Sequence, residues 1–240
     1  MIDHYDWAGG REAMLRFGPD TGPVVMMLLP LFEEHNRTRT FAVTICRALA
    51  DLGVASVLPD LPGQGESLLP TEAVTIFSLR EYVESLADHI GHERKAYIAA
   101  IRSGAMLDSF AIVAGRWYLS PHDGPALLKD LTRAKQAQLG LSVTLPACWY
   151  LDGDLPDGAP DPAVEIAGNL INPLLLADLE AVSPIDGGVL RIVRLESDPA
   201  AADAKFPGAP LWRRSEPGND PALAALLAAD IADWVRQCAG

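Results

Sequence analysis

The sequence predicts an α/β fold with a doubly wound, mostly parallel sheet. At 240 residues the chain suits one domain, which we place over residues 1–240. Continuous apolar runs at 23–31 and 54–59 are typical of strands that are buried on both faces. Apolar residues at helical spacing over 40–52 separate the two runs. The three segments together predict a βαβ crossover, the unit of a parallel sheet.

The other elements are justified by the same kinds of pattern. We expect an edge strand at 11–17, a loop at 30–39, and strands at 116–119 and 188–195. Extended pieces are expected at 143–151 and 163–167, and helices at 77–90, 125–139, 171–182 and 221–237. Strands and helices alternate in this order, so we expect the functional site at the carboxyl ends of the strands.

The segment 95–106 is typical of a buried strand that turns sharply into a helix. At the apex of such an elbow the backbone is strained, and the residues two before and two after it must be small. Ala100 and Gly104 satisfy this rule if Arg102 is the apex. With Ser103 at the apex, the bulky Ile101 would occupy one of the two positions. The spacing therefore predicts an arginine at the position where a serine, cysteine or aspartate nucleophile would be expected. Arginine cannot attack a carbonyl.

Composition excludes several classes of function. A net charge of −13 argues against nucleic acid or an anionic membrane as partner. No apolar stretch is long enough for a membrane span, and the first residues do not have the pattern of a leader peptide, so we expect a cytoplasmic protein. Cys46, Cys148 and Cys238 are far apart in the sequence and have no ligand-spaced histidine, so we expect reduced thiols, no metal site and no cofactor.

Four stretches of sequence carry a family resemblance. The segment DLPGQGES at 60–67 follows a predicted strand, lacks the residues of a phosphate-binding loop, and has the form that α/β-hydrolases carry after their fourth strand. The segments PLFEEHNR at 30–37, IRSGA at 101–105 and VEIAG at 164–168 resemble the exosortase A system-associated hydrolases, the second hydrolase family found beside PEP-CTERM sorting genes. The resemblance spans roughly residues 23–237 and implies the α/β-hydrolase fold with a small or absent lid.

The resemblance also implies a catalytic triad for ester or thioester hydrolysis, and the sequence departs from that triad. Asp198 follows a late predicted strand and matches the position of the acid. The histidine should lie near 213–218, but no histidine follows His122. With Arg102 at the apex, two of the three triad positions differ from the enzyme pattern. We therefore expect a pseudoenzyme with weak or no esterase activity, acting as an accessory of exosortase sorting.

The alternative is an active ester or thioester hydrolase. Ser103 would then be the nucleophile, and His122 or His35 would serve as a relocated base because both lie in loops expected near the site. The competing interpretation, which we favour, is that both histidines are ordinary residues of solvent-facing loops. A third option is a scaffold in polysaccharide or protein-sorting machinery whose pocket has lost its function.

The positive charge of Arg102 predicts that its partner, either a ligand or another side chain, is an anion. A guanidinium in a partly dry pocket needs an anion. Glu33, Glu34, Asp198 and Glu216 are the candidate carboxylates, since all four are expected on loops that converge at the carboxyl ends of the strands. An anionic or acyl small molecule is the ligand that such a pocket would take.

Overall fold

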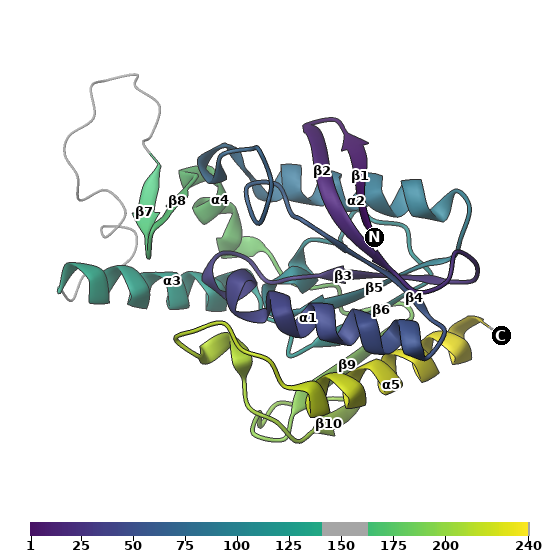
Figure 1. Ribbon diagram of the computed structural model, residues 1–240. Helices are drawn as coiled ribbons and strands as arrows, with labels where there is room; N and C mark the ends of the chain where they lie inside the picture. The colour runs from purple at the N-terminus through teal and green to yellow at the C-terminus, as the bar shows by residue number, and fades with distance from the viewer. Residues whose placement is uncertain (141–162, 240) are drawn as a thin grey trace.

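An eight-stranded sheet forms the centre of the protein, with helices on both faces (Figure 1). The structure is a computed structural model and describes residues 1–140 and 163–239. Strands lie in the order β1-β2-β4-β3-β5-β6-β9-β10. Their bounds are β1 Ile2–Trp7, β2 Gly10–Phe17, β3 Val24–Leu28, β4 Ala55–Pro59, β5 Ala96–Ile101, β6 Gly115–Leu119, β9 Leu190–Leu195 and β10 Ala204–Phe206.

Strand directions confirm the predicted mostly parallel sheet. From β4 through β10 every neighbouring pair is parallel, while β1 and β2 are antiparallel to each other and β2 is antiparallel to β4. The prediction of an edge strand at 11–17 is wrong in one respect, because β2 is paired on both sides and β1 forms the edge. Neither β1 nor the short β10 was predicted, since half of the residues of β1 are Asp or His and β10 has only three residues.

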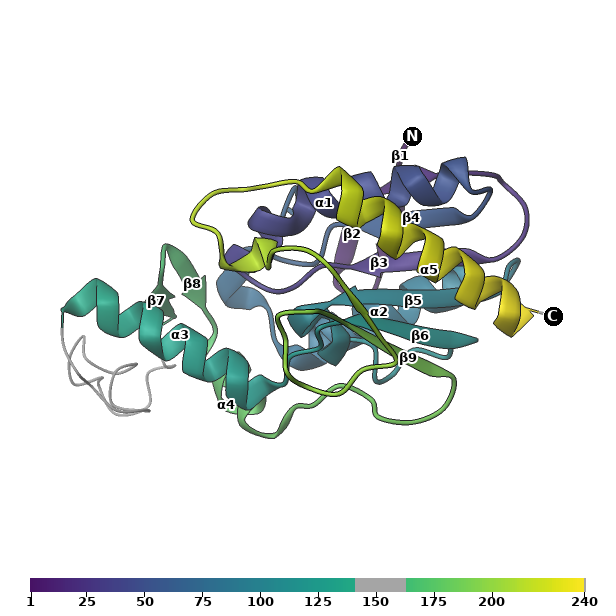
Figure 2. The same cartoon turned by 90° about the horizontal axis from the view of Figure 1, so that it is seen from below.

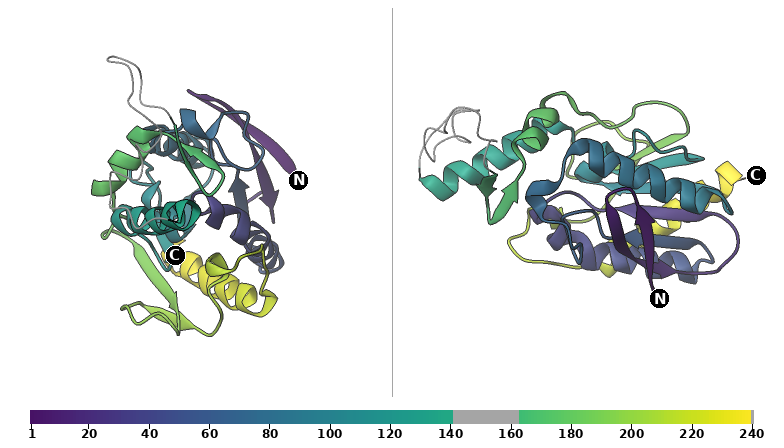
Figure 3. Two further views of the ribbon diagram at one scale, coloured as in Figure 1. Left: turned by 90° about the vertical axis from the view of Figure 1, so that its left-hand side faces the viewer. Right: turned by 90° about the horizontal axis from the view of Figure 1, so that it is seen from above.

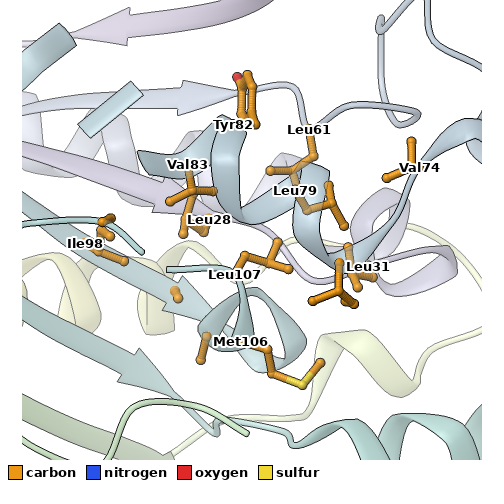
Figure 4. Close-up of a cluster of buried hydrophobic side chains, with 14 of the residues drawn as sticks. Leu28, Leu31, Leu61, Val74, Leu79, Tyr82, Val83, Ile98, Met106 and Leu107 are labelled. Carbon is orange, nitrogen blue, oxygen red and sulfur yellow. The ribbon is translucent and has the colours of Figure 1, made fainter. Parts of the chain in front are cut away.

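Each face of the sheet has its own helical layer and its own core. Helices α1 (Glu33–Asp51) and α5 (Pro221–Ala239) lie side by side on one face (Figure 2). Helix α2 (Ile76–Gly91) covers the other face, where its buried residues meet those of β3 and β5 (Figure 4). Alternate residues of β3 belong to the two cores, with Val24, Met26 and Leu28 on the α2 side and Val25 and Met27 on the α1 side.

Helix α1 begins earlier than predicted, at Glu33 instead of near Thr40. Its buried stripe continues into the first two turns through His35 and Thr38, which are polar. An apolar periodicity cannot detect buried positions that polar residues occupy. The loop predicted at 30–39 is therefore largely helix, and its acidic first turn suits the positive end of the helix dipole.

The described parts of the segment between β6 and β9, residues 120–140 and 163–189, include elements that project from the end of the sheet where the parallel strands terminate (Figure 3). It contains α3 (Gly124–Leu139), a hairpin of β7 (Val164–Ile166) and β8 (Asn169–Ile171), and α4 (Pro173–Asp178). The helix predicted over 171–182 is only partly right, because its first residue belongs to β8 and a separate 3-10 turn, Leu179–Ala181, follows α4. The extended piece predicted at 143–151 and Cys148 lie outside the described residues. Cys46 and Cys238 are free thiols.

Across residues 1–140 and 163–239, no helix combines the length and the apolar character that crossing a membrane requires.

Candidate functional site

Backbone strain is concentrated around one end of the sheet. In the described residues, four non-glycine positions have positive φ: Phe32 (58°), Arg102 (54°), Ser120 (46°) and Ala167 (50°). Phe32, Arg102 and Ser120 follow the neighbouring strands β3, β5 and β6, and Ala167 lies in the turn of the β7–β8 hairpin. Non-glycine residues adopt this conformation at a cost, and such residues cluster at functional sites. All four line one of two adjoining cavities described below.

Arg102 is the apex of the elbow after β5, at the position that the spacing predicts. The small residue two positions later is necessary, because a Cβ at Gly104 would lie 2.7 Å from the carbonyl oxygens of Leu28 and Leu29. The helix expected after the elbow is a short 3-10 helix, η2 (Arg102–Met106). The chain instead turns to bury Asp108, whose Oδ2 accepts hydrogen bonds from Arg116 and Tyr118.

The Arg102 side chain is held by a carboxylate and an aromatic ring. Its Nε and Nη2 donate to Glu34 Oε2 and Oε1, both at 3.3 Å, and its guanidinium lies 5.3 Å from the ring centroid of Trp212. Asp130 Oδ2 is 3.9 Å from Nη2. Arg102 is only 9% exposed, so both contacts are largely screened from water. Burial raises the pKa of Glu34, and the nearby Arg102 opposes that rise.

Glu34 is one of the four carboxylates considered as partners for Arg102, and the other three do not form an ion pair with it. Glu33 accepts from Asn169 at 3.3 Å and lies 3.9 Å from Arg37. Asp198 pairs with Arg194, as described below. Glu216 is exposed on the segment before α5. The sequence did not indicate Asp130, because a lone acidic residue on the predicted helix 125–139 resembles an ordinary surface charge.

Ser103 points away from any open surface. It is fully buried, and its Oγ accepts the backbone N–H of Leu31 at 2.9 Å. This contact joins the elbow to the segment after β3. A substrate carbonyl has no access to an oxygen in that position, so the geometry does not favour a nucleophilic Ser103.

The two candidate bases lie in different environments, and none of the hydrogen bonds between described residues joins either of them to Ser103. His35 lies on α1, is 1% exposed, and has its Nε2 3.5 Å from Arg39 Nη1. Burial lowers the pKa of His35 to about 4, with a further contribution from Arg39. His35 is thus a buried helical residue, and the reading of it as a solvent-facing loop residue is wrong.

His122 lies beside Arg102. Its backbone N–H donates to the Arg102 carbonyl at 3.3 Å, and its Nε2 is 3.2 Å from Asp130 Oδ2 without the alignment of a hydrogen bond. Burial and then Arg102 lower the pKa of His122, and these effects outweigh the opposite influence of Asp130. A neutral His122 is therefore favoured at neutral pH.

Asp198 follows β9, where the triad acid was expected. Burial alone would raise its pKa, but hydrogen bonds from the Ala200 N–H at 3.0 Å and from Arg194 Nη1 at 2.7 Å lower it. The carboxylate is thus ionised and already paired. The segment 213–218, which was expected to supply a histidine, contributes Arg213 to the site, and Trp212 directly precedes it.

The larger cavity beside Arg102 has a volume of about 450 Å³. All three stretches that resemble the exosortase-associated hydrolases contribute to it, through Leu31, Phe32, Glu33, Glu34 and Arg37, through Arg102, and through Ile166 and Ala167. Helix α3 adds Leu127 and Leu131. Four arginines (Arg37, Arg102, Arg133, Arg213) line it against three carboxylates (Glu33, Glu34, Asp130), so the lining has a formal charge of +1 in a protein of charge −13.

A smaller cavity of about 180 Å³ adjoins it. Arg102, Trp212 and Arg213 line both cavities. The smaller one is also lined by Asp198, so it lies among the positions that the sequence assigned to nucleophile, acid and histidine. Within the described ranges, no group of three histidine, cysteine or acidic side chains could hold a metal ion.

Comparisons with known proteins identify the fold. No family model matches the sequence, and no curated protein sequence does either. A putative hydrolase from Agrobacterium vitis S4 has a similar structure, with a TM-score of 0.62 at 18% identity over 98% of both chains. Est1E from Butyrivibrio proteoclasticus, solved with ferulic acid, has a TM-score of 0.61 at 15% identity over 98% of both chains.

A third similar structure is the α/β-hydrolase domain-containing protein 10 from mouse, with a TM-score of 0.59 at 14% identity over 99% of both chains. At such identities the likeness concerns the fold and not the activity. The strand order, the elbow after β5 and these neighbours together show that the chain has the α/β-hydrolase fold.

Proposed function

We propose that this protein uses the α/β-hydrolase fold to bind an amphipathic anionic ligand and has weak or no esterase activity. The observation that carries the proposal is the Arg102 side chain, which occupies the elbow apex and is fixed there by Glu34 and Trp212. A guanidinium cannot act as a nucleophile at any physiological pH. The degenerate triad is part of this proposal, since the site combines Arg102 at the apex with no histidine after Asp198.

The ligand class follows from the lining of the larger cavity. Leu31, Phe32, Leu127, Leu131 and Ile166 provide apolar walls, while the arginines give the lining its positive charge. Glu34 already occupies the Nε and Nη2 edge of Arg102. Arg37 is the better anion ligand, because its side chain is 27% exposed and its nearest carboxylate oxygen, Glu33 Oε2, lies 3.9 Å from Nη2. A carboxylate on an acyl chain fits both features.

Binding of octanoate, measured by isothermal titration calorimetry, tests the ligand class. We expect Arg37→Gln to weaken octanoate binding by about tenfold, the usual effect of losing a charge-assisted hydrogen bond. Arg47→Gln is the matched control, because Arg47 lies exposed on the same helix and does not line the cavity. Equal affinities for the two variants would count against the proposed site.

The active hydrolase remains the second candidate, with Ser103 as nucleophile and His122 or His35 as base. A fluorophosphonate probe separates the two candidates, since it labels an activated serine. We expect no labelling and only background hydrolysis of nitrophenyl butyrate. Labelling that disappears in Ser103→Ala would favour the hydrolase, and a parallel loss in His122→Ala or His35→Ala would identify the base.

An accessory role in exosortase sorting completes the proposal, and exosortase-system proteins are its candidate partners. Its support is the resemblance of the segments 30–37, 101–105 and 164–168, all of which line the larger cavity. In a host that carries the sorting system, deletion should impair the sorting of PEP-CTERM proteins. Complementation by Ser103→Ala but not by Arg37→Gln would support a binding role, whereas the reverse pattern would support catalysis.

A further inference from the structure

The smaller cavity has polar groups that nothing in the described protein satisfies. Ser120 is 1% exposed, lines the cavity, and has its Oγ buried without a hydrogen-bond partner in the described residues. Its backbone adopts φ 46° directly after β6 while its N–H donates to the Val193 carbonyl. An unpaired buried hydroxyl destabilises the folded protein, and so does a non-glycine residue in this conformation. The unpaired Oγ and the strained backbone of Ser120 together indicate that a ligand forms a hydrogen bond with this hydroxyl.

The charges around this cavity favour an anion. Arg102 and Arg213 line it together with one carboxylate, Asp198. That carboxylate is already paired with Arg194 at 2.7 Å and with the Ala200 N–H at 3.0 Å. The two guanidinium groups therefore give the lining of this cavity a net positive charge.

One nitrogen of the Arg102 guanidinium, Nη1, is available to donate a hydrogen bond to a ligand. Glu34 engages its Nε and Nη2 and lines only the larger cavity. Nη1 has no hydrogen-bond acceptor among the described residues. Arg213 is exposed and likewise forms no ion pair within the described part of the chain. Both arginines can therefore donate to an added anion without breaking an internal pair.

The rest of the lining indicates what kind of anion fits. Leu195, Pro199, Pro210 and Trp212 provide the apolar part of a lining that also includes Ser197. This apolar part gives the alkyl group of a small organic anion a contact that a fully hydrated inorganic ion would not use. A volume of about 180 Å³ is well below that of the larger cavity. The planar, forked guanidinium of arginine matches the two oxygens of a carboxylate.

We propose that this cavity is a second binding site, specific for a short-chain carboxylate, in which Ser120 Oγ, Arg102 Nη1 and Arg213 hold the carboxylate and Trp212 contacts the alkyl group. The inference deepens the proposed function, because Arg102 also lines the larger cavity. The two sites differ in the residues that bind the ligand, since Ser120 lines only the smaller cavity and Arg37 only the larger.

Calorimetric titration with acetate, butyrate and inorganic phosphate at constant ionic strength, set with chloride, tests the proposal. We expect butyrate to bind more tightly than acetate and phosphate to bind most weakly. Ser120→Ala should weaken butyrate binding by about tenfold, as for a buried hydrogen bond to a charged group. Arg213→Gln should weaken it by about threefold to fivefold, because an exposed charge is screened by solvent.

Two controls separate this site from the larger one. Arg214→Gln removes the neighbouring exposed arginine, which does not line the cavity, and should leave butyrate binding unchanged. Arg37→Gln should weaken octanoate binding and leave butyrate binding intact. Butyrate binding that responds to Arg37→Gln but not to Ser120→Ala would overturn the second site while leaving the larger one standing. Phosphate binding tighter than butyrate, or no butyrate binding, would also overturn it.

Discussion

Arg102 and Glu34 form a two-pronged ion pair, with Nε and Nη2 each 3.3 Å from a carboxylate oxygen. The pair joins the elbow after β5 to the first turn of α1, two segments far apart in the sequence. Its side chains are 10% and 17% exposed, so neither charge is well solvated. Removing one member of such a buried pair is more damaging than replacing both.

The Arg102–Glu34 pair predicts how variants of Arg102 will fold. Arg102→Ala should lower the free energy of unfolding by about 3–5 kcal/mol, because it leaves Glu34 unpaired and removes the contact with Trp212. Arg102→Met keeps much of that contact and should cost clearly less. Urea denaturation at pH 7 measures both. Arg133→Ala, which removes a 64% exposed arginine paired with Asp130, is the control and should change stability by less than about 1 kcal/mol.

The double variant Arg102→Met, Glu34→Gln completes a mutant cycle for this pair. If the ion pair stabilises the fold, the double variant should be more stable than the sum of the two single changes predicts. Additive effects would show that the two side chains do not interact energetically.

Ser103 contributes to stability through its hydrogen bond to the Leu31 N–H. Ser103→Ala leaves that buried N–H without an acceptor, so we expect a loss of about 1–3 kcal/mol in the free energy of unfolding. Ser109→Ala is the matched control, because the buried Oγ of Ser109 has no hydrogen-bond partner among the described residues. Thermal and urea denaturation should distinguish the two variants. Equal stability of both would mean that the Leu31 contact contributes little.

The close approach at Gly104 gives a prediction about packing. In Gly104→Ala the new methyl group would lie 2.7 Å from two backbone carbonyl oxygens, which cannot move without displacing β3. We expect a loss of at least about 2 kcal/mol or failure to fold. A new methyl at Gly187 would meet nothing within 4 Å, so Gly187→Ala should be tolerated. A Gly104→Ala variant as stable as Gly187→Ala would contradict the elbow geometry.

Local spacing was enough to predict the elbow and the parallel strands. The small residues at 100 and 104 identify Arg102 as the apex because the constraint is steric and acts over five residues. The buried strands were recognised from their mostly apolar residues, because both faces of β3 and β4 are buried. Their strand bounds differ from the predictions mainly at the ends.

Partners that come from distant segments could not be predicted in the same way. The sequence suggested four carboxylates for Arg102, and only the folded chain selects Glu34 among them. Asp130 and Trp212 join the site through α3 and the segment before α5, and neither belongs to a motif. Ser120 is similar, because its significance lies in a backbone angle and an unpaired hydroxyl that have no signature in the sequence.

His35 gives a prediction about pH. Its pKa is lowered from the usual 6.5 to about 4 in the folded protein, chiefly by burial. Between these values the unfolded chain binds a proton that the folded protein does not, so stability falls as the pH falls through this window. From pH 7 to pH 5 the loss due to His35 should be about 2 kcal/mol. In His35→Gln this component disappears, so stability should fall less between the two pH values. Urea denaturation at pH 7 and pH 5 provides the measurement.

His4→Gln serves as the control for that experiment, because His4 lies exposed on β1 and its replacement should leave the difference between pH 7 and pH 5 unchanged. Some pH dependence should persist in His35→Gln, since burial and Arg102 also lower the pKa of His122 and its effect has the same sign. If His35→Gln loses as much stability on acidification as the unmodified protein, His35 accepts a proton in the folded state. The first turns of α1 would then have to admit water around the ring, contrary to its 1% exposure.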